Sequence, residues 1–102
     1  MVIYNVTLII EEDIREEWLS WMQETHIPDA MATGKFIGYN LLYVLDSPNE
    51  GHSYCVQYKA RSIEDYNTYV EEDAARLQGD LAARFENRYV AFRTLMEVVD
   101  EK

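Results

Sequence analysis

The chain has 102 residues, of which 48% are apolar and 13% aromatic, and its formal net charge is −10. This length corresponds to one domain over residues 1–102, and the apolar content is enough for a hydrophobic core, which argues against disorder. The negative charge repels phosphate backbones and anionic lipid, so we expect no nucleic acid and no membrane among the partners.

Several absences favour a cytoplasmic location. The single cysteine, Cys55, cannot form an internal disulfide, which fits a reducing compartment. The first residues lack the basic and apolar regions of a signal peptide, and no apolar run approaches the roughly 18 residues of a membrane span. The sequence shows no glycine-rich phosphate loop and no spaced His and Cys ligands, so we expect no cofactor and no metal.

The opening third of the chain predicts a strand followed by a helix. Residues 2–10 alternate, which indicates a strand with one wholly apolar face. Asp13 is suited to cap a helix that begins at Ile14, and Trp18 and Trp21 share the apolar stripe of that helix. The stripe is made up of Ile14, Trp18, Trp21 and Thr25, widened by Leu19 and Met22.

A His-Ile-Pro step follows this stripe. Pro28 disfavours helical geometry in the residue before it, so we expect the helix to end or kink near His26. Pro28 can also open a second short helix, which Gly34 would close. We expect this segment to form one wall of any functional site.

The middle of the chain predicts a β-hairpin, and the last part a helix and a strand. Residues 36–45 and 53–60 have the pattern of strands, and the turn formers between them make a loop in which His52 is most simply solvated. One long helix is expected from Ser62, its N-cap, with Gly79 as the place for a bend. Its stripe consists of Ile63, Tyr66, Val70, Ala74, Leu77, Leu81 and Phe85, and the last strand covers 89–99.

This order of elements is that of an α+β, ferredoxin-like β-α-β-β-α-β fold. Right-handed crossovers place two helices on one face of a four-stranded antiparallel sheet, which leaves the other face bare. The bare face would be too apolar for water, so we expect a second copy to cover it in a two-fold homodimer. The residues expected on it are Ile3, Asn5, Thr7, Ile9, Phe36, Gly38, Asn40, Leu42, Cys55, Gln57, Lys59, Tyr89, Ala91, Arg93, Leu95 and Glu97.

Four residues are the main candidates for a small-molecule site. His26 could act as general acid or base on a phenol or enol, or could simply bond a last-turn carbonyl. Trp18 and Trp21 could stack on a planar ligand, although two Trp at helical spacing are also typical of a core. Arg93 could hold a carboxylate or phenolate, or could pair with Glu97.

Three amides are weaker candidates for ligand binding. Asn5, Asn40 and Gln57 could orient a carbonyl group of a ligand, or could satisfy one another across adjacent strands.

The motifs at residues 3–7, 18–22, 26–34 and 91–95 resemble, from end to end, those of a small bacterial family of unknown function. More loosely, the chain resembles the dimeric α/β-barrel superfamily. That group contains cofactor-free monooxygenases for quinol-type aromatics, EthD-like proteins, small isomerases and cyclases, and haem-binding relatives. Several EthD-like members carry an aromatic residue shortly before a His-x-Pro step, and Trp21, His26 and Pro28 match that arrangement.

Two functions remain open from the sequence. The first is a homodimer that binds a small apolar or aromatic ligand, with the cofactor-free oxygenase, isomerase or cyclase chemistry that the resemblance implies. In it, His26 would act as acid or base and Arg93 as an anion anchor. The second is a non-enzymatic dimerisation or protein-interaction module, in which Arg93 would lie in the interface. Fold analogy alone does not decide between an enzyme and a binding module.

Overall fold

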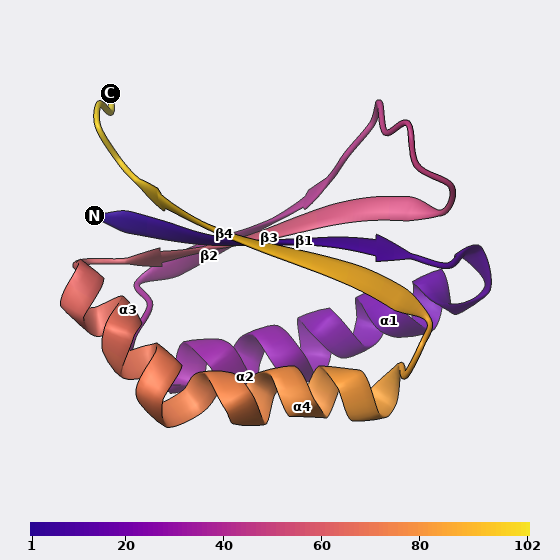
Figure 1. The fold of residues 1–102 in the computed structure, drawn as a ribbon, viewed down its shortest axis with the longest axis horizontal. Coiled ribbons are helices and arrows are strands. Elements are labelled where there is room, and N and C mark those ends of the chain that lie inside the picture. The colour runs from indigo at the N-terminus through magenta and orange to yellow at the C-terminus, as the bar shows by residue number, and fades with distance from the viewer.

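The computed structural model describes residues 1–102 and has two layers, a sheet and a layer of helices that covers one face of it (Figure 1). The four strands are antiparallel and lie in the order β2-β3-β1-β4. This is the ferredoxin-like arrangement, and the predicted fold is confirmed. The strands are β1 (Val2–Ile10), β2 (Gly38–Tyr43), β3 (His52–Ala60) and β4 (Tyr89–Glu97).

Two long helical segments, each with one wide π-helical turn, form the second layer (Figure 1). None of the helices combines the length and the apolar character needed to cross a membrane. The first segment contains a 3₁₀ turn (Glu12–Ile14), α1 (Arg15–Trp21), a π turn (Met22–His26) and α2 (Ile27–Ala32). The second contains α3 (Ile63–Tyr69), a π turn (Val70–Ala74) and α4 (Ala75–Arg84).

Each π turn shifts the buried stripe of its helix by one residue. Across the second turn the stripe passes from Tyr69 to Ala74, a step of five residues, whereas a regular helix repeats after three or four. Val70, predicted on the stripe, is therefore exposed, and Tyr69 is buried in its place. The first turn makes the same step from Met22 to Ile27. For this reason Thr25, also predicted on a stripe, is exposed.

Most of the helix ends and breaks agree with the sequence pattern. The predicted break near His26 is the π turn Met22–His26, and α2 then begins at Ile27 with Pro28 in its first turn, as predicted, where the missing N–H of proline costs no hydrogen bond. Gly34, with φ of +77°, ends this segment as predicted. Ser62 caps α3, since its hydroxyl accepts a backbone hydrogen bond of 3.2 Å. As predicted, the second segment continues as a helix through Gly79, and its change of helical period lies earlier, in the π turn Val70–Ala74.

Two polar residues have roles other than those predicted. Asp13 does not cap a helix, because its carboxylate accepts hydrogen bonds from Arg88 near the start of β4. His52 is not a solvated loop residue, because it begins β3 and its ring is held by two partners. The Tyr43 hydroxyl lies 2.9 Å from its Nδ1, and the Glu12 carboxylate contacts its Nε2. The Glu12 contact joins the first helical segment to the sheet, and the Tyr43 contact joins β2 to β3.

The β-ladders decide which side chains face the helices. Arg93 on β4 lies opposite Val6 on β1, and side chains that are opposite each other in an antiparallel ladder share a face. Arg93 and the alternate residues of β4 that share its side of the sheet therefore face the helices. Their predicted place on the bare face is wrong. Phe36 was also placed wrongly, since it precedes β2 and packs in the core 4.9 Å from the Tyr58 ring.

No helix packs on the other sheet face, which we call the open face (Figure 1); the loop between β2 and β3 contacts it at Ser53, through the Ser47 hydroxyl at 2.9 Å. The side chains of β1, β2 and β3 that point to this face are the ones that the alternation predicted. It contains Ile3, Asn5, Thr7, Ile9, Gly38, Asn40, Leu42, Ser53, Cys55, Gln57, Lys59, Val90, Phe92, Thr94 and Met96.

Candidate functional site

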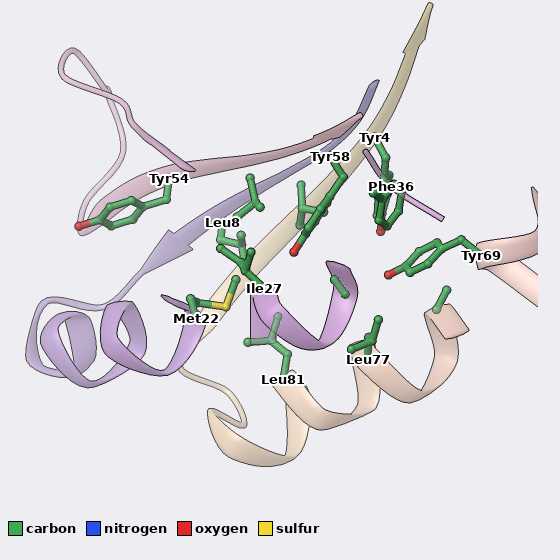
Figure 2. Close-up of a cluster of buried hydrophobic side chains, with 14 of the residues drawn as sticks. Tyr4, Leu8, Met22, Ile27, Phe36, Tyr54, Tyr58, Tyr69, Leu77 and Leu81 are labelled. Carbon is green, nitrogen blue, oxygen red and sulfur yellow. The ribbon is translucent and has the colours of Figure 1, made fainter. Parts of the chain in front are cut away.

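A small cavity lies between the sheet and the helices, and we call it the His26 cavity. Its volume is about 20 Å³, enough for roughly one water molecule. Apolar side chains of both layers form most of its wall (Figure 2), and a few polar groups converge on it. It is lined by Tyr4, Val6, Leu8, Met22, His26, Val56, Tyr58, Tyr69, Leu77, Gln78, Leu81 and Arg93.

The π turn places His26 at this cavity with one ring nitrogen unused. The imidazole stacks on the Trp21 ring, with 4.9 Å between centroids and 30° between planes. The Phe85 ring in turn packs edge-on against the Trp21 ring, with 5.6 Å between their centroids. The buried Nδ1 of His26 has no hydrogen-bond partner, so the ring is not tied to a last-turn carbonyl through that atom. A half-buried imidazole with a free nitrogen is available to a ligand.

The surroundings of His26 favour its neutral form. Burial lowers the pKa of His26 below its ordinary value, and the charge of Arg93 lowers it further. The carboxylates of Asp29 and Asp80 act in the opposite direction without reversing the shift. A neutral imidazole at pH 7 can accept a proton or a hydrogen bond, which is what a general base needs.

Arg93 lies at the edge of the same cavity. It belongs to β4, the edge strand, and its side chain is exposed while it lines the cavity. The guanidinium forms no ion pair, so the alternative pairing with Glu97 is not present. The two strongest candidates from the sequence, His26 and Arg93, are thus brought together by the fold.

The two tryptophans have different places. Trp18 is fully buried in the core, 4.9 Å from the ring of Tyr54, and does not line the His26 cavity. Trp21 does not line it either, but it supports the imidazole of His26 by stacking.

The three amides lie on the other side of the sheet. Asn40, Gln57 and Asn5 face one another across β2, β3 and β1, in one row of the open face. They form no side-chain hydrogen bonds with one another, and Asn5 donates to the Thr7 hydroxyl at 2.9 Å. They are therefore separated from His26 by the sheet.

Sequence reasoning missed four polar residues of the cavity, Tyr4, Tyr58, Tyr69 and Gln78. Tyr58 was identified as part of a strand but not as a site residue. Tyr69 lies outside the predicted stripe and reaches the cavity because the π turn shifts the stripe, whereas Gln78 flanks the stripe on α4 beside Leu77. A five-residue step between apolar positions would have been the signal for that turn.

A larger hollow, of about 610 Å³, lies at one end of the sheet and shares no residue with the His26 cavity. It is open and lined by Glu11, Glu12, Asp13 and Glu50, with Arg88 between them. Arg88 is already paired with Glu11 at 3.0 Å and with Asp13. No group of three or more His, Cys, Asp or Glu side chains is arranged to hold a metal ion.

The fold and the cavity define the class of protein: a ferredoxin-like chain with a small cavity between its two layers. The chain belongs to the family DUF4286, described as a domain of unknown function, whose model matches residues 1–99. The match confirms the prediction from the motifs, which was a family that has no assigned activity. No curated protein matches the chain by sequence.

Solved structures of the same fold cover almost the whole chain. A dimeric ferredoxin-like protein from an uncultured marine organism has a TM-score of 0.74 at 15% identity, covering 100% of this chain and 98% of its own. An EthD family protein from Bacillus halodurans has a TM-score of 0.67 at 15% identity, covering 95% and 98%. A mutant of MhuD with two manganese protoporphyrin IX bound per active site has a TM-score of 0.70 at 16% identity, covering 100% and 98%. Identities this low establish the fold alone.

Proposed function

We propose that this protein binds a small, largely apolar or aromatic ligand at the His26 cavity, as a homodimer. The observation that carries the proposal is the convergence of a free His26 nitrogen and an unpaired Arg93 on one apolar cavity. Apolar walls with a few polar groups are typical of small-molecule sites. His26 would exchange a proton with the ligand, and Arg93 would attract its negative end.

The volume of the cavity restricts how a ligand can bind. With room for roughly one water molecule, it can hold one polar end of a ligand while the rest lies at the mouth near Arg93. A ligand with a larger buried part would require the walls to move apart. Similar folds support such binding, since the MhuD mutant holds two metal porphyrins in each active site.

The homodimer is proposed from the open face. Phe92 is 56% exposed and Val90 52% exposed on β4, and the same face carries Met96 on β4 and Leu42 on the opposite edge strand β2, both also exposed. The face carries no carboxylate, although the chain has 19 acidic residues. Two copies of an acidic chain would therefore repel least when these faces meet. One protein with the same fold is itself described as dimeric.

The alternative function, a non-enzymatic interaction module, draws on the same face. In this alternative the open face would bind a second copy or another protein, and the His26 cavity would hold only water. Asn5, Asn40 and Gln57 belong to this surface, so we assign them to the interface rather than to the ligand. The buried Oδ1 of Asn5 has no partner within the chain, which an interface could supply.

Native mass spectrometry of protein purified without added ligand tests the proposal. A dimer with extra mass that is lost on acidification supports ligand binding, and loss of that mass in His26→Ala, with the melting temperature little changed, places it at this cavity. A His26→Ala variant that is strongly destabilised yet keeps the ligand would contradict the role of His26. A dimer that never carries a ligand, even after incubation with small aromatic compounds, would favour the interaction module.

A further inference from the structure

Three tyrosines line the His26 cavity, and none of their hydroxyls has a hydrogen-bond partner in the protein: Tyr4 from β1, Tyr58 from β3 and Tyr69 from α3. Tyr58 and Tyr69 are each only 3% exposed, and neither hydroxyl takes part in a hydrogen bond of the structure. Figure 2 shows both hydroxyls pointing into the layer between sheet and helices, one from β3 and the other from α3. Neither oxygen is among the fully enclosed polar atoms that lack a partner, so each hydroxyl keeps access to the space of the cavity, where a water molecule or a ligand atom can bond to it.

The groups around these hydroxyls are donors of hydrogen bonds. Burial raises the pKa of both Tyr58 and Tyr69, so the phenols keep their protons at any physiological pH. The guanidinium of Arg93 and the amide of Gln78 line the same cavity. No Asp or Glu lines it, in a chain that has 19 acidic residues.

This composition selects the charge of the ligand. A cation would meet Arg93 and find no carboxylate, and a purely apolar ligand would leave the hydroxyls unpaired. An oxygen anion would accept hydrogen bonds from both phenols in a setting of low polarity, where charge-assisted bonds are strong. Within the cavity, His26 is the group able to take up the proton of an acidic ligand.

We propose that Tyr58 and Tyr69 form an oxyanion-binding pair, which holds the oxygen of a small phenolate, enolate or carboxylate. This inference rests on the proposed function, because it names the ligand class of the same cavity. In the free protein one water molecule would take the place of that oxygen, as the volume allows. The body of the ligand would extend toward Arg93 at the β4 edge.

The test uses 4-nitrophenol, whose phenol and phenolate forms absorb at different wavelengths. At a pH near the pKa of the probe, addition of the wild-type protein should raise the phenolate fraction, because the site prefers the anion. Tyr58→Phe and Tyr69→Phe, which keep the rings, should each weaken binding of the phenolate about tenfold while binding of the neutral phenol changes little. Tyr66→Phe is the matched control, because Tyr66 lies on α3 beside Tyr69 but does not line the cavity.

The outcomes separate this inference from the proposed function. If the wild-type protein binds both forms equally, or if both cavity variants behave like Tyr66→Phe, the oxyanion pair is wrong while ligand binding stands. If the wild-type protein binds neither form at millimolar probe, the pair and the aromatic ligand of the proposed function both fail. Thermal melting of each variant shows whether a loss of binding comes from a loss of folding.

Discussion

Arg93 lies directly opposite Val6 in the β1–β4 ladder, and this pairing turns its guanidinium toward the helices and the cavity that contains His26. A shift of one residue in the register would have placed Arg93 on the open face. The pairing thus joins two residues 67 positions apart in the chain, His26 and Arg93, in one electrostatic environment.

Removal of the Arg93 charge should raise the pKa of His26. The guanidinium disfavours the protonated imidazole, so Arg93→Gln removes one cause of the lowered value. An NMR titration of the His26 ring protons measures the change. Arg61→Gln, at an exposed position after β3, is the control and should leave the titration of His26 as it is. An unchanged pKa in Arg93→Gln would show that Arg93 does not face the helix side in solution.

The stability of the protein should depend on pH through His26. The pKa of His26 in the folded chain is below its ordinary value of 6.5, so the unfolded chain binds the proton more readily. The free energy of unfolding should therefore fall as the pH decreases below about 6.5, and this loss should be absent in His26→Gln. Urea denaturation of both proteins at a series of pH values gives the difference. Parallel curves for the two proteins would contradict the burial of His26.

A carboxylate on the open face should break the homodimer. Phe92→Asp places an unpaired charge near its own copy across the two-fold axis, and burial of such a charge is costly. Sedimentation equilibrium should show dimeric wild type and a monomeric variant. Ile63→Asp makes a comparable change at the start of α3, on the helical layer, where a carboxylate is favourable, and should remain dimeric. A dimeric Phe92→Asp would place the interface elsewhere.

Deletion of Glu71 should be tolerated, because it falls within the π turn after Tyr69. Without this exposed residue, Tyr69 and Ala74 would be four positions apart, which is the regular helical spacing. The stripe would survive, and the loss of stability should stay below about 1 kcal/mol. Deletion of Gly79 in the regular helix α4 should cost about 2 kcal/mol or more, because it rotates Leu81 out of the core. Thermal or urea unfolding compares the two, and equal losses would contradict the π turn.

The sequence by itself determined the order of elements, the fold class and the buried phases of β1 and β3. These follow from local patterns: strict alternation in Val2–Ile10, turn formers in the hairpin loop, and Ser62 as an N-cap. His26 and Arg93 were also identified, because an isolated histidine at a helix break and an isolated arginine in a strand are unusual in an acidic chain. The family assignment rested on motifs spread over the whole chain.

Only the tertiary structure decided which groups meet. β4 is an edge strand whose more apolar side, with Val90, Phe92 and Met96, lies on the open face, so its polarity pattern pointed to the wrong register and Arg93 was assigned to the wrong face. The π turns change the helical period within five residues. As a result Tyr69 takes the buried position, where it lines the cavity, and Val70 is exposed. Both effects depend on packing between layers. The backbone positions that bring Tyr58, Tyr69, His26 and Arg93 together are therefore set by contacts that no local sequence window contains.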